Sequence, residues 1–227
     1  MKPLPLAAVA QAEMPLQDNS VELSAQIRFV ADLAARAAIV VLFSMMAFRF
    51  GSDFLATGRV TGLFLLLSEA LVVVLTVARR SAITIDRTMT ARVLTAASMA
   101  GPPLLAPAAV AALASESVTV ALSCVGLAIV IAGKVALGRS FALLPANRGI
   151  VSSGMYRLVR HPIYMGYLVA HVAYLLANPT LWNITALVLA DAALLVRAVR
   201  EERTLALDPA YREYQQQVRW RVAPGIF

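Results

Sequence analysis

Apolar residues in this chain fall into runs long enough to cross a bilayer, and charged residues gather in the short segments between them. A helix needs about 20 apolar residues to span the hydrocarbon core. The predicted helices cover residues 20–50 (with the membrane part near 33–50), 59–78, 90–113, 117–137, 162–177 and 180–200. The pattern therefore predicts an all-α fold, a polytopic bundle of transmembrane helices with about six crossings.

Local signals mark several helix ends. Asn19 stands three residues before Glu22, which predicts a capping box at the first helix. Gly101-Pro102-Pro103 and Pro107 should kink or break the third helix, so five crossings with one re-entrant element is the alternative. The last two helices are joined only by Asn178-Pro179, which predicts a tight antiparallel hairpin.

The pattern of the C-terminal segment predicts a short helical lid. The sixth helix is expected to continue beyond the membrane to Leu207, and Asp208 to cap a final helix beginning at Pro209. Within this last helix Tyr211 and Tyr214 share a face with Val218. We expect that face to fold over a cytoplasmic site.

Composition agrees with a membrane protein. The chain of 227 residues is 60% hydrophobic and 15% charged, whereas soluble domains are about 45–50% apolar. The net charge of +7 does not indicate nucleic acid, because 18 of the 20 basic residues are arginines placed in loops. Cys124, alone in an apolar run, is expected to be a small buried residue, with no disulfide and no thiolate metal site.

The loop arginines also predict orientation. The loops at 79–92 and 138–160 and the C-terminal tail are rich in arginine, whereas the segments around 115–117 and 178–180 have none. This alternation places the arginine-rich loops and both termini in the cytoplasm, in what the composition suggests is a bacterial inner membrane. We expect a loose leader at 1–19, four helices without a recognisable motif at 20–135, and a catalytic region at 136–227.

Polar groups converge on the cytoplasmic face of the last two helices. Arg160 and His161 stand directly before Pro162, which suits the first position of a helix. The paired Glu201-Glu202 lies where the next helix returns to the same face. Gly149 and Gly154 lie in the preceding loop, at points where backbone can approach a ligand.

Further polar residues descend into the membrane on the same two helices. Tyr164, Tyr167, His171 and Tyr174 form a stripe on the fifth helix, and Asp191 lies on the face of the sixth helix that carries Glu202. Arg197 lies on the neighbouring face with Glu201. Ionisable groups at membrane depth normally face an interior or a cavity.

Each feature also has a structural interpretation. The loop arginines suit topology signals, the tyrosines an interfacial belt, and His171 a satisfied bundle residue. Glu69 and Asp191 suit interhelical hydrogen bonds, and the glutamate pair a solvated face. Their joint occurrence at one membrane face favours a polar chamber beside lipid.

The motifs in this region resemble one family. They comprise Gly149–Gly166 with its Arg-His-Pro, then Arg200-Glu201-Glu202-Arg203, then Tyr211-Arg212-Glu213-Tyr214 and a closing Ala223-Pro224-Gly225. Together, over roughly 136–227, they resemble the isoprenylcysteine carboxyl methyltransferases and the related phospholipid methyltransferases. Asp208-Pro209-Ala210 departs from the aromatic-Gly pair that is frequent there, which changes a turn and removes no reacting group.

The resemblance implies an integral membrane enzyme that uses S-adenosyl-L-methionine and no metal. The residues it implies for the cofactor are Val151, Gly154, Tyr156, Arg160, His161, Pro162, Tyr164, Gly166, Glu201 and Glu202. A carboxylate would face the sulfonium cation. His161 and amides at the helix N-terminus would bind the cofactor carboxylate.

The acceptor is expected to be a lipophilic or lipidated molecule among membrane lipids. A carboxylate acceptor, as in isoprenylcysteine O-methylation, needs a cationic anchor such as Arg197 or Arg200. An amine, as in phospholipid N-methylation, needs a base such as Glu202, His171 or a tyrosine. A thiol acceptor is a further alternative. The sequence does not indicate the oligomeric state.

Two other classes are alternatives. Membrane sterol reductases that use NADPH have a similar C-terminal pattern, but a glutamate pair would repel their phosphate-rich cofactor. A transporter or assembly factor could use Glu69 and Asp191 as a proton path. That class predicts paired half-repeats, and the sequence shows none.

Overall fold

The computed structural model describes residues 41–78, 82–141 and 144–227. The leader and most of the first predicted helix lie outside the described residues. Residues 45–227 form one compact unit. Its first helix runs to residue 57, beyond the predicted end at 50, and ends at Gly58, whose positive φ of 74° suits a glycine after a helix.

Most predicted helices are confirmed to within a few residues. They are α2 (Thr61–Ala78), α4 (Glu116–Leu137), α5 (Pro162–Ala177), α6 (Leu181–Leu205) and α7 (Pro209–Gln217). Proline begins α5 and α7, and the Asp208 side chain accepts a hydrogen bond from the Ala210 N–H, as a capping residue should. Two 3-10 turns, η2 (Gly138–Ser140) and η3 (Gly154–Arg157), lie in the loop before α5.

The third helix is shorter than predicted. α3 (Met89–Leu104) begins after the capping residue Thr88 and ends one residue beyond Pro103, well before the expected end at 113. Two successive prolines remove two backbone donors, and the chain leaves in an extended conformation at Leu105. The break was predicted, but residues 105–113, which the structure describes, form no helix after it.

Two of the described helices are long and apolar enough to cross a membrane, over Glu116–Ser140 and Leu181–Leu205. Two shorter apolar helices cover Thr61–Ala70 and Pro162–Ala177. The protein is thus mostly helical and has candidate spans, and the count of six crossings remains a prediction.

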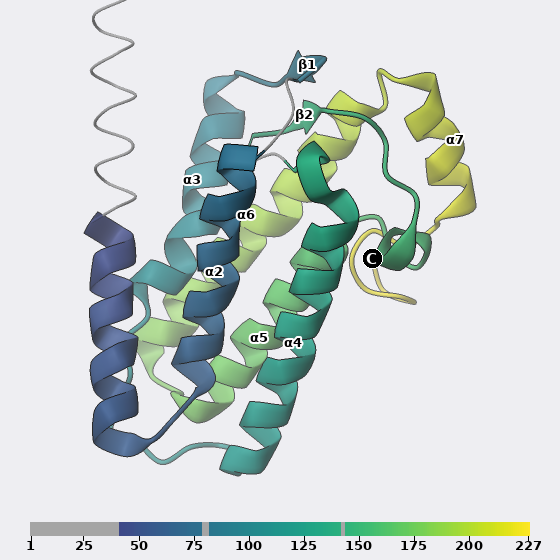
Figure 1. Cartoon of the computed structure of the whole chain (residues 1–227). Helices are drawn as coiled ribbons and strands as arrows, with labels where there is room; N and C mark the ends of the chain where they lie inside the picture. The colour runs from purple at the N-terminus through teal and green to yellow at the C-terminus, as the bar shows by residue number, and fades with distance from the viewer. Residues whose placement is uncertain (1–40, 79–81, 142–143) are drawn as a thin grey trace, which may run out of the picture. The chain divides into compact units, whose positions relative to one another are not determined.

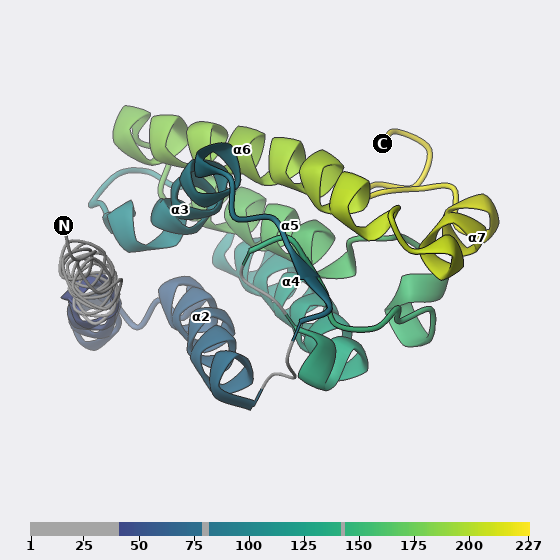
Figure 2. The same ribbon diagram turned by 90° about the horizontal axis from the view of Figure 1, so that it is seen from above.

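The last two helices each pack mainly against another partner. α5 lies along α4, and α6 lies along α3 (Figures 1 and 2). The close approach of α4 and α5 depends on small residues, because a Cβ added to Gly166 would lie 2.7 Å from the Gly126 carbonyl oxygen. The turn of the predicted hairpin is confirmed. The expectation that α5 and α6 pack tightly against each other is wrong, because α5 packs mainly on α4 and α6 mainly on α3. Side chains and a cavity lie between α5 and α6.

The same small residues correct the interpretation of Cys124. Gly126, Val130 and Gly133 are buried on α4, and Gly126 and Gly133 lie against α5. Cys124 precedes Gly126 by two positions, about 200° around the helix, and is exposed. It therefore lies on the outer side of α4, where an apolar thiol suits contact with lipid.

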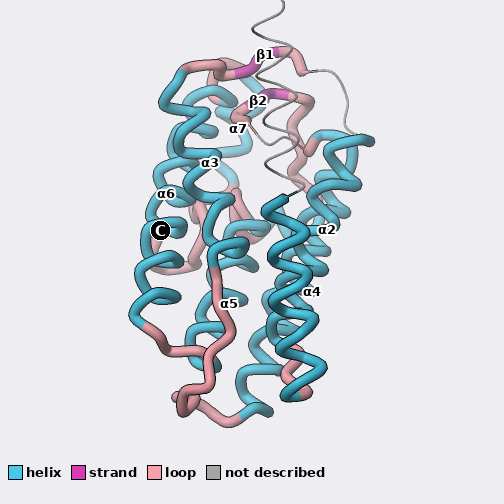
Figure 3. The backbone as a smooth tube through the Cα atoms, turned by 90° about the vertical axis from the view of Figure 1, so that its left-hand side faces the viewer, coloured by secondary structure: helices cyan, strands magenta, loops and turns pink. Residues whose placement is uncertain are grey.

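A small antiparallel sheet, not predicted, joins two loops. β1 (Thr84–Ile85) pairs with β2 (Ala146–Asn147), with Thr84 opposite Asn147 (Figure 3). Asn147 also donates a hydrogen bond of 2.9 Å to the Asp208 carboxylate at the start of α7. Three arginine-rich segments therefore meet at one end of the unit.

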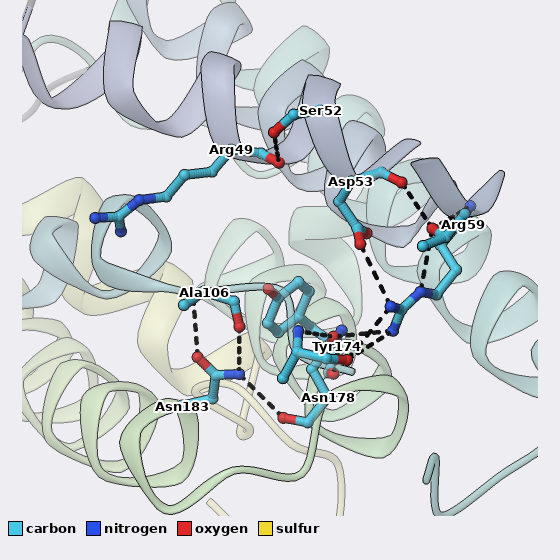
Figure 4. Close-up of polar contacts among 10 residues, drawn as sticks. Arg49, Ser52, Asp53, Arg59, Ala106, Tyr174, Asn178 and Asn183 are labelled. Atoms are coloured by element: carbon cyan, nitrogen blue, oxygen red, sulfur yellow. Dashed lines mark hydrogen bonds and ion pairs between the residues drawn. The ribbon is translucent and has the colours of Figure 1, made fainter. Parts of the chain in front are cut away.

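Polar side chains close the opposite end, at the turn between α5 and α6 (Figure 4). Asn183 donates to the Ala106 carbonyl and accepts from the Ala106 N–H, at 2.9 and 3.0 Å. The side-chain oxygen of Asn178 accepts from Arg59 at 3.2 Å and from the Ala108 N–H at 3.1 Å. These hydrogen bonds pair backbone N–H and carbonyl groups of the extended segment that follows α3.

Candidate active site

One cavity of about 1080 Å³, including its mouth, extends between α5 and α6. Its outer end is lined by the loop before α5 and by α7, with residues Gly149, Ile150, Val151, Tyr156, Tyr211 and Tyr214. Its inner end lies deeper in the bundle and is lined by Glu69, Ser98, Tyr167 and His171. Helices from both halves of the chain therefore form one chamber.

The start of α5 is tied to the C-terminal tail. The N–H groups of Arg160 and His161 donate to the carbonyls of Trp220 and Arg221, at 2.9 and 2.7 Å. We expected amides here to bind a cofactor carboxylate, but the tail already uses these two. The expectation is wrong for them, because the chain returns as an extended segment and satisfies its own backbone.

Glu202 connects the start of α5 to the tail. Its carboxylate is buried and lies 3.3 Å from both Arg160 Nε and His161 Nε2. Arg221 Nε donates to its other oxygen at 2.9 Å, and Gln215 Nε2 at 3.4 Å. Paired cations offset the cost of burying this charge. Glu202 is not among the residues that line the cavity.

Glu201 does line the cavity, and it accepts a hydrogen bond of 2.7 Å from the Tyr164 hydroxyl. Neighbouring residues on a helix point about 100° apart, so the two glutamates cannot share one environment. Glu201 therefore lines the chamber, whereas Glu202 links the start of α5 to the C-terminal tail.

Aromatic and cationic groups stack between the two ends. The rings of His161 and Tyr164 are nearly parallel, with centroids 5.1 Å apart. The Arg197 guanidinium lies 5.5 Å from the centre of the Tyr164 ring, and its Nη1 donates to Ser98 Oγ at 3.4 Å. Arg197 is thus a buried cation in the wall of the cavity.

The loop and α7 close the outer end with neutral hydroxyls. Gly149 has a φ of 102°, which allows the loop to turn at the cavity wall. The Tyr214 hydroxyl donates to the Tyr156 carbonyl at 2.7 Å. Burial, reinforced by the Glu201 charge, raises the pKa of Tyr156 well above its ordinary value. Burial, with the nearby glutamates, also raises the pKa of Tyr211, so both stay protonated at neutral pH.

Four further residues expected in the site lie away from the cavity lining. Arg200 is 3.9 Å from Asp86 and faces the β1 loop. Gly166 serves the contact of α5 with α4, and Pro162 starts α5 beside Gly133. Gly154 has a φ of 59° at the start of η3, so its role is conformational. These four residues are therefore not part of the proposed site.

The inner end contains groups that the motifs did not reveal. Lys134 is fully buried, donates to the Ser68 carbonyl at 2.6 Å and lies 5.2 Å from the Tyr167 ring centre. Tyr167 also neighbours Glu69. An ionisable residue inside an apolar run was the available signal for Glu69 and Lys134. Their meeting depends on the packing of α2 on α4, which no local pattern specifies.

The structure gives no candidate metal centre within the described residues: no three His, Cys, Asp or Glu side chains are grouped to hold an ion. The polar groups of the cavity are instead a carboxylate, a guanidinium, an imidazole and phenols. This set can bind a charged organic molecule and move a proton.

Residues 114–212 match the phospholipid methyltransferase family. This part, a little under half of the chain, is similar to that family. It runs from just before α4 into α7 and contains Arg160-His161-Pro162 and Glu201-Glu202. The match confirms the resemblance to membrane methyltransferases and supports an S-adenosylmethionine-dependent enzyme rather than a reductase or a transporter. No curated protein matches the chain.

Proposed function

We propose that the protein is a membrane methyltransferase that holds S-adenosylmethionine at the outer end of the cavity and a lipophilic acceptor at the inner end. The observation that carries the proposal is the Glu201 carboxylate, oriented by Tyr164 at 2.7 Å inside an aromatic-walled chamber. The chamber continues from there into the apolar part of the bundle, where the acceptor would lie.

The residues present suit the cofactor. S-adenosylmethionine carries a sulfonium cation and supplies an electrophilic methyl group when bound. A carboxylate in a water-poor site attracts such a cation strongly. Tyr156, Tyr211 and Tyr214 provide ring faces for the adenine and for cation–π contact. The arrangement supports Glu201 as the cofactor carboxylate and His161, stacked on Tyr164, as part of the wall.

Glu202 and α7 are proposed to keep the site closed. The Glu202 ion pairs join the start of α5 to the tail, and Tyr214 joins α7 to η3. Exclusion of water strengthens the electrostatics of the site, and methyl transfer depends mainly on positioning. We propose an aqueous opening beside the loop at 149–160 and a lateral opening between helices for the lipid.

The cavity end is proposed to face the cytoplasm. The contact of β1 with β2 and of Asn147 with Asp208 brings three arginine-rich segments together. Positive loops favour the cytoplasmic side, so a shared end agrees with the predicted orientation. A water-soluble cofactor would then reach the site directly.

Two acceptor classes suit the polar groups of the cavity. Arg197 is a buried cation that could anchor a carboxylate, as in isoprenylcysteine-type O-methylation, which the sequence favours. Phospholipid N-methylation needs a base instead. Arg200, the second anchor considered, is turned toward Asp86 and supports neither class.

Calorimetry of the purified protein with S-adenosylmethionine, S-adenosylhomocysteine and NADPH in turn tests the proposal. Only the first two should bind. Glu201→Gln should weaken S-adenosylmethionine binding by about 10- to 100-fold, because a charge-assisted contact of roughly 1.5–3 kcal/mol is lost. The loss should be smaller for S-adenosylhomocysteine, which lacks the sulfonium charge. Glu213→Gln removes the same charge from the exposed side of α7 and is the matched control.

Binding of NADPH alone, or equal affinities in Glu201→Gln and the unchanged protein, would contradict the proposed cofactor site.

A further inference from the structure

His171 lies at the inner end of the cavity in an unusual state. Its ring is 3% exposed, and its Nδ1 lies 2.7 Å from Asp191 Oδ1 on α6. Its Nε2 is buried and has no hydrogen-bond partner, and the residue lines the cavity. Buried polar atoms are almost always paired, so an unpaired one beside a chamber requires an explanation.

The Asp191 contact determines which nitrogen carries the proton. A carboxylate only accepts, so the short contact places the hydrogen of a neutral His171 on Nδ1. Nε2 then presents a lone pair. An imidazole whose tautomer and orientation are set in this way by a carboxylate is prepared to accept a proton.

We infer that His171, oriented by Asp191, is the general base that takes a proton from the methyl acceptor, so that the acceptor is an amine or a thiol. The inference rests on the proposed methyltransferase function. A carboxylate acceptor has no proton to lose at neutral pH, and a base aimed at it would have no task.

The placement along α5 suits two substrates in one chamber. His171 follows Tyr164 by seven residues, about 10 Å along the helix axis. Tyr164 marks the proposed cofactor end through Glu201, and His171 marks the opposite end of the same cavity. An acceptor bound at the inner end could therefore reach both the base and the methyl group.

Methyl transfer with this base conserves atoms and electrons. The acceptor proton passes to Nε2 of His171, and the freed electron pair on nitrogen or sulfur forms the bond to the methyl carbon. The carbon–sulfur bond of the sulfonium breaks, and its electron pair stays on that sulfur as a neutral thioether. The imidazolium left beside Asp191 releases its proton to solvent after product leaves.

Charged and titratable groups surround the imidazole from three helices besides its own. They are Glu69 from α2, Lys134 from α4, Asp191 and Arg197 from α6, and Tyr167 on α5, whose ring centroid is 6.1 Å from that of His171. These groups will also affect how activity depends on pH. The tests therefore compare variants in which all of them except the substituted residue are kept.

The first test reads the tautomer directly and needs no acceptor. The chain has two histidines, so ¹⁵N-histidine spectra in detergent contain two ring systems, and the signals lost in His171→Asn belong to His171. We expect a protonated Nδ1 and an unprotonated Nε2, and loss of this fixed pattern in Asp191→Asn. A proton on Nε2 in the neutral ring would overturn the inference.

The second test measures methyl transfer to three probes in vesicles: phosphatidylethanolamine, dodecanethiol and N-acetyl-S-farnesylcysteine, which offer an amine, a thiol and a carboxylate. His171→Asn keeps a donor toward Asp191 and removes Nε2, the buried nitrogen without a partner. It should lower kcat for the amine or the thiol by about 100-fold or more at neutral pH. The loss should shrink as pH rises, because solution then deprotonates the acceptor.

Tyr174→Phe is the matched control, since it removes a buried hydroxyl one turn further along α5 that does not line the cavity. An equal loss at every pH in His171→Asn would indicate a merely structural role. Transfer to the carboxylate alone, or to none of the three probes, would also overturn the inference. S-adenosylhomocysteine binding, measured on the same samples, separates this failure from failure of the proposed function.

Discussion

The two ends of the helical unit use polar residues in opposite ways. At the turn between α5 and α6, Asn178 and Asn183 bond to backbone and to Arg59, and these bonds close the end (Figure 4). At the other end, Glu201 and His171 line a cavity, and His171 Nε2 is buried without a partner. Satisfied polar groups stabilise a fold, whereas available ones bind and react.

The same contrast appears between the adjacent residues Glu201 and Glu202. Glu202 contacts two arginines and His161, and these contacts hold the start of α5 to the tail. Glu201 has one hydroxyl partner and faces the chamber. A residue type or a motif position therefore does not assign a role by itself. The partners that tertiary packing supplies do.

Removal of the closing segment is expected to have the largest effect. Deletion of residues 209–227 removes Tyr211 and Tyr214 from the cavity and leaves Glu202 without Arg221 and Gln215. Binding of S-adenosylhomocysteine and turnover should both be abolished, while membrane insertion persists because both candidate spans remain. Calorimetry and membrane fractionation measure the two results. Full affinity in the truncated protein would show that the tail is outside the site.

Disruption of the closed end should lower stability and leave cofactor affinity unchanged. Asn183→Ala leaves the N–H and carbonyl of Ala106 without their partners, at a cost of roughly 2–4 kcal/mol. Thermal unfolding in detergent should shift clearly downward. The dissociation constant for S-adenosylhomocysteine should stay within about twofold below the unfolding range. A large loss of affinity would mean that the two ends are coupled.

A smaller effect is expected within the open end itself. Tyr214→Phe removes one hydrogen bond to the Tyr156 carbonyl and keeps the ring in the wall, at a cost of about 1 kcal/mol. Cofactor affinity should fall by about fivefold. Burial raises the pKa of Tyr214, so its hydroxyl stays protonated, and the variant should not change the pH profile of binding between about pH 6 and 9. A changed profile would indicate that this hydroxyl titrates.

Several site features could be read from local patterns. Pro162 and Pro209 mark helix starts, and the Arg160-His161 and Glu201-Glu202 pairs indicated where the proposed site lies. Such signals are local, since a proline ring acts on its own turn and needs no distant partner. The family match over 114–212 agrees with the function class that these motifs predicted.

Other features depend on contacts between distant segments. The prolines of α3 indicated that the helix would end near them. They did not indicate that the following residues form an extended segment, because that segment is held by hydrogen bonds to Asn178 and Asn183. The position of Arg200 in the sequence suggested an anchor for a carboxylate acceptor. Only its contact with Asp86, in another loop, shows that it is turned away from the cavity.

The sequence by itself determined that this is a helical membrane protein with charged motifs at one end, because hydropathy and helix signals act over a few residues. Only the tertiary structure decided that Glu201 faces the chamber, that Glu202 ties the tail, and that His171 meets Asp191. The reason is that these roles depend on which helix faces are brought within hydrogen-bond distance, and packing of α4 on α5 and of α3 on α6 sets that.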